Sequence, residues 1–277
     1  MIYAYSDIGE YIESAPIEVT VTKAIPEYTV PTNVTAKLGQ KLSEIKLPEG
    51  FEWMDPTQVV QETGNIAFSA KYVPADAINY ETIENIEITI NVNNRIPFND
   101  VSKNSWYYNS VVYVFENNMI LGTSDTTFNP DGDLTRGMLV TILWRMEGSP
   151  KATSNQFTDV GASQYYYNAV NWAASKKIIS GYGNGKFGPN DKITREQLAV
   201  ILRNYAQFKK KDVSARTDLS KFTDNKYISS YAKDAVSWAV ANKIISGKSE
   251  GTRVDPHGKA TRAETATMLY NYCMNIK

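Results

Sequence analysis

Residues 95–277 consist of three copies of one sequence unit, and this repetition limits the fold more than any other feature of the chain. Each copy opens with Phe-x-Asp, continues through an apolar run to a glycine, and then passes through a turn-rich loop to a Thr-Arg pair. The arginine always lies six residues after a proline of that loop: Pro130 to Arg136, Pro189 to Arg195, and Pro256 to Arg262. Two short helices cannot bury their apolar faces alone, so we expect the copies to pack together.

Each copy predicts a helix, a loop and a second helix. We expect the first helix to end at the glycine after the apolar run, because glycine is favoured at helix C-caps. The second helix begins after a threonine, which is a good N-cap, and in copy two Gln197 completes a capping box. The glycines are Gly122, Gly181 and Gly247, and the threonines are Thr135, Thr194 and Thr261.

The arginine after each threonine lies where a positive charge is unfavourable, by about 0.3–1 kcal/mol, because a helix N-terminus is electropositive. An anion would relieve this cost, since free N–H groups and a planar guanidinium both bind carboxylates or phosphates. Alternatively, each arginine pairs with an acid of its own chain, such as Asp133 or Asp191 just upstream. Copy three has Gly258 and Lys259 in that loop, which argues against this alternative.

The first part of the chain has a different pattern. Runs such as "IAFSAKYV" and "IENIEITINVN" alternate within residues 25–93 and are separated by Pro, Gly, Asn and Asp, which predicts short antiparallel strands. Residues 10–22 align with residues 79–91 at a constant offset of 69. We therefore expect the chain to begin with the last strand of one β-domain and to be a C-terminal piece of a longer protein.

Charge differs between the two parts. Residues 1–95 hold 14 Asp and Glu against 6 Lys and Arg, a net charge of −8, whereas residues 96–277 hold 16 against 23, a net charge of +7. The two values sum to the whole-chain charge of −1. A basic C-terminal part favours an anionic partner. No stretch approaches the roughly 20 apolar residues of a membrane span, so none is expected.

The three units resemble the S-layer homology (SLH) domain. The family pattern runs from Phe-x-Asp-Val through a Trp-containing helix, Gly-Tyr and Phe-x-Pro to Thr-Arg-Ala-Glu. Copy two carries most of it in "FTDV" and "AVNWAASKKIISGYGNGKFGPNDKITREQ", copy three has "TRAE", and copy one has "TRGM". Residues 25–93 look like the Ig-like repeats of bacterial surface proteins, which are recognised mainly by strand pattern.

The resemblance implies a multidomain fold: an all-β Ig-like sandwich, then an all-α pseudo-trimer of helix-loop-helix SLH repeats around a central three-helix bundle. Residues 1–24 would be the terminal strand of a truncated preceding repeat, and residues 25–94 the complete Ig-like repeat. SLH repeats one, two and three would span residues 95–150, 151–211 and 212–277.

The resemblance also implies a function. Family members anchor bacterial surface and S-layer proteins noncovalently to the cell wall, by binding anionic, pyruvylated secondary cell wall polysaccharide in grooves between repeats. The location would be extracellular, at the wall or S-layer, with a signal peptide upstream of this piece. Two alternatives stay open: a protein–protein or self-assembly module, and attachment to peptidoglycan modified with a diamine.

The predicted ligand-binding residues come from seven positions of the repeat. The aromatic residues could stack on sugars or fill the core, the aspartates could be helix N-caps or contact the ligand, and Gly-Tyr-Gly lets a backbone approach a ligand closely. The set is Arg136, Arg195, Arg262, Thr135, Thr194, Thr261, Trp106, Tyr165, Tyr231, Gly181, Tyr182, Gly183, Asp100, Asp159 and Asp224.

Several catalytic and metal-binding patterns fail on inspection. His257 is the only histidine, which excludes multi-histidine metal sites and leaves little room for a Ser-His-Asp triad. Residues 242–249 resemble a P-loop but begin with Asn242, and residues 127–138 lack the carboxylates of an EF-hand. We therefore expect no enzyme activity, no cofactor, no metal site and no nucleic-acid partner.

Overall fold

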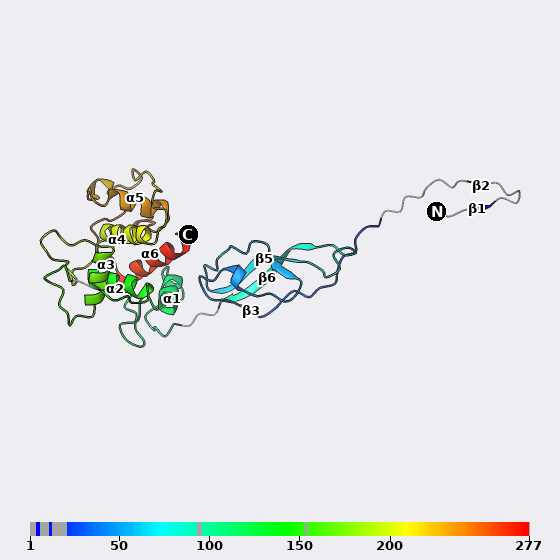
Figure 1. The fold of residues 1–277 in the computed structure, drawn as a ribbon, viewed down its shortest axis with the longest axis horizontal. Helices are drawn as coiled ribbons and strands as arrows, with labels where there is room; N and C mark the ends of the chain where they lie inside the picture. The colour runs from blue at the N-terminus through cyan, green and yellow to red at the C-terminus, as the bar shows by residue number, and fades with distance from the viewer. Residues whose placement is uncertain (1–3, 6–10, 13–20, 93–95, 153–154, 277) are drawn as a thin grey trace. The chain divides into compact units, whose positions relative to one another are not determined.

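The computed structural model describes all residues except 1–3, 6–10, 13–20, 93–95, 153–154 and 277. The chain divides into two compact units (Figure 1). The sheet unit consists of Met1–Thr35, Leu42–Gln58 and Asn65–Asn91, and the helical unit consists of Ala36–Lys41, Val59–Gly64 and Val92–Lys277.

The sheet unit is built on one four-stranded sheet with strand order β3-β6-β5-β4. Strand β3 runs parallel to β6, with Val34 opposite Ile90, and β4 runs antiparallel to β5. Buried and exposed residues alternate along β6, so one face of the sheet meets the core. The strands are β3 (Val34–Thr35), β4 (Phe51–Trp53), β5 (Gly64–Tyr72) and β6 (Ile83–Val92), with a 3-10 helix at Leu42–Glu44 and a separate antiparallel pair, β1 (Ala4–Tyr5) and β2 (Tyr11–Ile12).

The prediction of an all-β Ig-like sandwich is wrong. A sandwich buries two antiparallel sheets against each other, whereas the described residues of the sheet unit hold one four-stranded sheet that includes a parallel strand pair. Alternation predicts a buried face but does not reveal what covers it. Here Leu42, Ile45 and Trp53 add to the core, and the Trp53 Nε1 group donates to the Ile45 carbonyl at 3.0 Å. Much of the predicted strand within residues 1–24 lies outside the described residues.

The helical unit has two helices per repeat, and the three threonines are N-caps as predicted. Each threonine hydroxyl accepts a hydrogen bond from the N–H three residues later, and capping boxes are complete in α4 and α6. The first helices are α1 (Tyr108–Glu116), α3 (Tyr167–Ser175) and α5 (Lys233–Ala241), and the second helices are α2 (Arg136–Met146), α4 (Arg195–Phe208) and α6 (Arg262–Asn275). A 3-10 helix spans Asn225–Tyr227.

The first helices end earlier than the glycines predict. Each is followed by a non-glycine residue in the left-handed conformation: Asn118 (φ 54°), Lys177 (φ 58°) or Lys243 (φ 56°). The next N–H reaches back to the helix, as in the bond from Ile178 to the Ala173 carbonyl at 2.9 Å, which is the pattern of a Schellman motif. The chain therefore turns inward about four residues before the glycine.

The closest helix pairs join different repeats. Helix α2 of repeat one packs against α3 of repeat two, α4 packs against α5 of repeat three, and α6 closes the cycle by packing against α1 (Figure 1). Each second helix thus shares its buried surface with the first helix of the following repeat.

The prediction of an all-α pseudo-trimer around a central three-helix bundle is also wrong. Extended segments that precede the second helices form a closed ring of backbone hydrogen bonds: Leu134 donates to Ala260, Ala260 to Ile193, and Ile193 to Leu134, at 2.9–3.2 Å. Isolated antiparallel bridges flank the ring. The chain as a whole is therefore of mixed α/β class. Repeat length and helix periodicity do not indicate such a ring, because only three residues, far apart in sequence, form it.

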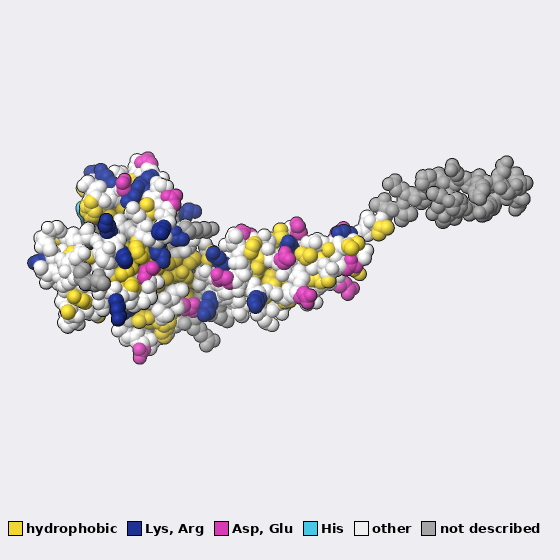
Figure 2. Space-filling model, viewed as in Figure 1, with side chains coloured by type: hydrophobic (Ala, Val, Ile, Leu, Met, Phe, Trp, Pro, Cys, Tyr) yellow, Lys and Arg dark blue, Asp and Glu magenta, His cyan; other side chains and the backbone are white. Residues whose placement is uncertain are grey.

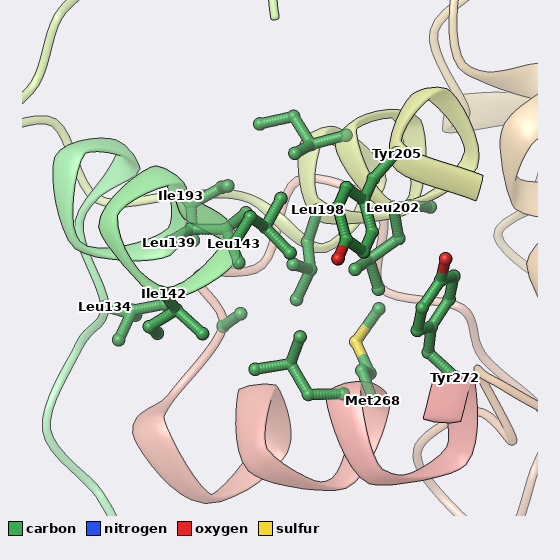
Figure 3. Close-up of a cluster of buried hydrophobic side chains, with 14 of the residues drawn as sticks. Leu134, Leu139, Ile142, Leu143, Ile193, Leu198, Leu202, Tyr205, Met268 and Tyr272 are labelled. Atoms are coloured by element: carbon green, nitrogen blue, oxygen red, sulfur yellow. The ribbon is translucent and has the colours of Figure 1, made fainter. Parts of the chain in front are cut away.

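Apolar side chains of the second helices pack beside this ring. Leu139, Ile142 and Leu143 of α2 face Leu198 and Leu202 of α4 and Met268 of α6 in Figure 3, and all six are buried. Buried residues from all three repeats belong to one continuous hydrophobic cluster. Burial of apolar surface shared by the repeats therefore stabilises the helical unit. No described helix has the length and apolarity needed to cross a membrane.

Candidate functional site

The three Thr-Arg arginines are buried and reach from one repeat into the next. Arg136 and Arg195 are each 5% exposed, and Arg262 is 8% exposed. Each Nε group donates to a loop carbonyl of the following repeat in cyclic order: Arg136 to Phe187 at 3.0 Å, Arg195 to Val254 at 2.8 Å, and Arg262 to Phe128 at 2.7 Å. All three guanidinium groups therefore lie at boundaries between repeats.

The first N–H groups of the second helices already donate hydrogen bonds within the protein. The N–H groups of Arg136 and Gly137 donate to the Asp191 and Pro189 carbonyls at 2.9 and 2.8 Å, and α4 and α6 repeat this arrangement. The third N–H of each helix donates to the capping threonine. The expectation that free helix N–H groups bind an anion is therefore wrong, and the guanidinium is the remaining donor.

A first cavity, groove A, has a volume of about 530 Å³ and combines residues of all three repeats. Repeat one supplies Arg136, repeat two supplies one loop and one face of α4, and repeat three supplies Tyr231. The lining is Arg136, Ile178, Ile179, Ser180, Gly181, Tyr182, Gln197, Val200, Ile201, Asn204 and Tyr231. It holds one cation, several apolar side chains and two amides, but no carboxylate.

Arg136 has no charged partner in groove A. Its guanidinium lies over the rings of Tyr182 and Phe187, with centroids at 4.8 and 4.6 Å, and its Nη2 donates to the Ser180 carbonyl at 3.3 Å. Among the described residues, no carboxylate lies within ion-pair distance of Arg136, and none accepts from its Nη1. Burial lowers the pKa of Arg136 more than nearby Tyr182 and Asp191 raise it. An anion in groove A would therefore offset a desolvation cost that the protein compensates only in part.

A second cavity, groove B, has the same design one repeat further on, with a volume of about 400 Å³. Repeat two supplies Arg195, repeat three supplies the loop and α6, and repeat one supplies Trp106. The lining is Trp106, Arg195, Ile244, Ile245, Ser246, Gly247, Lys248, Ser249, Glu264, Thr267 and Met268. Glu264 and Lys248 stand where groove A has Gln197 and Tyr182.

The charges in groove B are paired within the protein. Glu264 lies 3.4 Å from Arg195 Nη1 and 2.9 Å from Lys248 Nζ, and Lys248 also lies 3.1 Å from Asp255. The ion-pair alternative therefore holds for Arg195, although its partner is the capping-box glutamate and not an acid upstream. Asp133 pairs with Lys192 instead.

Arg262 is held by repeat one. Its Nη2 donates to the Leu121 carbonyl at 2.6 Å, and its guanidinium lies 4.7 Å from the Phe128 ring centroid. No carboxylate of the described residues lies within ion-pair distance of it. Burial lowers its pKa, and Asp100 only partly opposes this effect.

The three repeat aromatics are surface residues. Trp106, Tyr165 and Tyr231 are 68%, 58% and 59% exposed, so they do not fill the core. Tyr231 lines groove A and Trp106 lines groove B, whereas Tyr165 lines neither. Glu196, a buried residue of α4, accepts a hydrogen bond from the Tyr231 hydroxyl at 2.9 Å and fixes this side chain.

The three aspartates are loop anchors and not caps of α-helices. Asp159 accepts hydrogen bonds from the N–H groups of Phe187 and Gly188 at 2.9 and 2.8 Å. Asp100 and Asp224 bind the equivalent loops of their own repeats. The aspartates do not line groove A or groove B.

The Gly-Tyr-Gly segment contributes one contact residue for the arginine. A Cβ on Gly181 would lie 2.4 Å from the Lys186 carbonyl, so this glycine permits a close turn of the loop. Tyr182 is held by a 2.8 Å bond from its hydroxyl to Asp191. Gly183 has a φ of +85° and does not line groove A.

Sequence reasoning missed Gln197, Asn204, Lys248 and Glu264 as groove residues. Gln197 and Glu264 of "TRAE" match the capping-box pattern. This local role does not indicate that each also lines a groove together with an arginine of the preceding repeat. Figure 2 shows more Lys and Arg than Asp and Glu side chains on the visible face of the helical unit, consistent with its positive net charge. The described residues include no cluster of three or more potential metal ligands.

The family comparison matches the same three segments. Residues 97–137, 156–199 and 221–266 each match the S-layer homology domain. These segments contain the N-termini of all six α-helices, and they include the three Thr-Arg pairs.

Similar proteins include enzymes and surface-layer proteins. The chain is 31% identical to an endoglucanase of Bacillus sp. (strain KSM-635) over 176 residues, which cover 64% of this chain and 18% of the relative. It is 28% identical to the surface-layer 125 kDa protein of Lysinibacillus sphaericus, over 64% of this chain and 15% of that protein. It is also 28% identical to the S-layer protein sap of Bacillus anthracis, over 62% and 20%. The chain thus spans a fifth or less of these relatives.

Proposed function

We propose that this chain, which contains three S-layer homology domains in series, attaches a surface protein noncovalently to the bacterial cell wall. The similarity to surface-layer proteins supports this role. The relatives named as enzymes match only in the SLH region, which supports a noncatalytic module here. The location that follows is the cell surface.

The ligand in this proposal is an anionic wall polysaccharide, with a carboxylate such as that of a pyruvate ketal bound by Arg136. The observation that carries it is a buried guanidinium without a charged partner, directed at a groove of about 530 Å³. A planar guanidinium suits a carboxylate, and the exposed Tyr231 ring offers a surface on which a sugar can stack. The groove volume lies within the range of small-molecule sites.

Binding of the full chain to purified wall polysaccharide tests this proposal. We expect saturable binding that falls strongly after chemical removal of the acidic substituents. Arg136→Ala should weaken binding by about ten- to a hundredfold, the value of a charge-assisted hydrogen bond. Arg145→Ala, an exposed arginine on the same helix, is the matched control and should bind as the unaltered chain does.

Circular dichroism and thermal unfolding would show that both variants stay folded. Equal binding by folded Arg136→Ala and by the unaltered chain would contradict the proposed ligand contact. Self-association of the chain with no affinity for wall polysaccharide would favour the assembly alternative over wall attachment.

A further inference from the structure

Grooves A and B share one architecture but differ in charge. The third residue of the second helix is Gln197 in groove A and Glu264 in groove B, and both side chains close a capping box with the preceding threonine. Because both residues cap the helix, the difference between them is not required for helix formation. The difference does change the side chain that lies in the same groove as each arginine, which is a neutral amide with Arg136 and a carboxylate with Arg195.

In groove B, Glu264 pairs with both cations, and Asp255 supplies a second carboxylate beside Lys248. The two carboxylate oxygens of Glu264 face Arg195 and Lys248, at 3.4 and 2.9 Å. The side chains of Arg195 and Glu264 are 6% and 14% exposed, so solvent screens this pair weakly. A carboxylate that entered groove B would have to displace Glu264 or accept a like charge beside it.

In groove A the same position carries no charge. Gln197 lines the cavity together with Arg136, and the position of Lys248 is taken by Tyr182. Arg136 therefore keeps the positive charge of the cavity without a carboxylate in the lining. Each groove contains a guanidinium group, but among the described residues only the Arg136 guanidinium of groove A has no carboxylate within ion-pair distance.

We propose that the third residue of the second helix decides whether a groove accepts a carboxylate. Gln197 leaves Arg136 available to an acidic sugar in groove A, whereas Glu264 already occupies Arg195 and restricts groove B to uncharged sugar residues. This inference rests on the proposed function, because it assigns different parts of one polysaccharide to two grooves of the same unit. It also makes Gln197 and Glu264 specificity-determining residues.

Nuclear magnetic resonance of the arginine Nε–H groups tests each groove separately. Both Nε–H groups are buried and hydrogen-bonded, to Phe187 and Val254 respectively, so their exchange with water is slow enough for detection. The probe is a methyl glucoside that carries a pyruvate ketal, compared with its uncharged methyl ester. In the unaltered chain we expect the acid to shift the Arg136 signal and to leave the Arg195 signal in place.

Exchange of the two residues provides matched variants. In Gln197→Glu the affinity reported by Arg136 should fall about tenfold or more, as expected for a like charge placed beside the ligand. In Glu264→Gln the Arg195 signal should begin to respond to the acid but not to the ester. The double variant should transfer the response from Arg136 to Arg195. Thermal unfolding checks that the capping boxes, and hence the helices, are retained.

The outcomes separate this inference from the proposed function. Equal responses of Arg136 and Arg195 to the acid in the unaltered chain would overturn the charge selectivity, while wall attachment would stand. Responses that do not change in Gln197→Glu and Glu264→Gln would overturn the assignment of selectivity to these residues. If neither arginine responds in any variant and wall polysaccharide does not bind, both proposals fail.

Discussion

Each Phe-x-Asp aspartate acts on an arginine of the preceding repeat through a loop. Asp159 binds the N–H of Phe187, and the carbonyl of the same residue accepts the Nε–H of Arg136. Asp224 and Asp100 hold the loops that receive Arg195 and Arg262 in the same manner. The aspartates are therefore positioning residues, since they fix the carbonyls that orient the guanidinium groups.

Replacing Asp224 by Asn should destabilise the helical unit. The Asp224 carboxylate is buried and accepts hydrogen bonds from Val254 and Asp255 at 2.9 and 2.8 Å. An amide can accept at only one of its two ends, so one bond to a charged acceptor is lost, which costs about 1.5–3 kcal/mol. Urea unfolding at pH 7 measures the change. Asp125→Asn, at an exposed loop position, is the control and should change stability by less than about 0.5 kcal/mol.

This difference should shrink in acid. Burial alone would raise the pKa of Asp224, but the N–H groups of Val254 and Asp255 more than offset it, and the pKa lies below its ordinary value of 3.8. The carboxylate therefore contributes its full stability above pH 3.8, and the contribution is lost as the pH falls through the lowered pKa. A constant difference between the two chains from pH 7 to pH 2 would contradict the anchoring role.

The roles of single residues were only partly predictable. The threonine caps followed from local sequence, because a cap bonds within three residues of itself. The aspartate bonds span 28 to 31 residues and the arginine bonds span 44 residues or more, so no local pattern indicates them. Glu264 both completes a capping box and pairs with Arg195, which lies 69 residues away in the sequence. Only the capping role can be predicted from the local sequence.

At the scale of elements, two of the first helices end in a strained backbone conformation that a substitution by glycine would relieve. Lys177 and Lys243 adopt φ values of 58° and 56°, a region that costs an L-residue with a Cβ roughly 1–2 kcal/mol. Both side chains are exposed. Lys177→Gly and Lys243→Gly should each stabilise the protein, by about 0.5–1 kcal/mol, measured as a higher midpoint of thermal unfolding.

The equivalent residue of the first repeat provides the comparison. Asn118 has a φ of 54°, but asparagine tolerates this conformation better than lysine does, so Asn118→Gly should gain less. An equal gain at Asn118 and Lys177 would show that strain at the lysine is not the cause. Destabilisation by Lys177→Gly would show that the lysine side chain makes a contribution larger than its backbone strain.

Element type was predictable, but element partners were not. Alternation marks β6 as a strand with one buried face, and Thr-Arg marks the start of each second helix. The parallel pairing of β3 with β6 and the ring of Leu134, Ile193 and Ala260 depend on residues far apart in sequence. The prediction of the fold class was wrong for this reason, because a fold class depends on which elements pair with one another.

At the scale of the whole chain, the helical unit is a closed cycle whose parts are exchanged between repeats. Helix α6 packs against α1 just as α2 packs against α3 and α4 against α5, so the first and third repeats depend on each other as much as sequence neighbours do. Glu147 at the end of α2 adds a link to repeat two, because it binds the Tyr205 hydroxyl at 2.6 Å and Lys209 at 2.9 Å. In an open array, each repeat contacts only its sequence neighbours, so removal of the last repeat would not remove any contact of the first.

Removal of the third repeat should therefore unfold more than the third repeat. A chain that ends at Lys211 lacks α5 and α6, so apolar faces of α4 and α1 lose their partners, and the ring loses Ala260. We expect loss of cooperative thermal unfolding of the remaining helices and binding of a dye that reports exposed hydrophobic surface, with the full chain as the control. Addition of residues 212–277 as a separate polypeptide should restore part of the helical signal, because the missing surfaces are supplied in trans. A shortened chain that unfolds as sharply as the full chain, without dye binding, would show that the first two repeats are stable alone and that the cycle is not required.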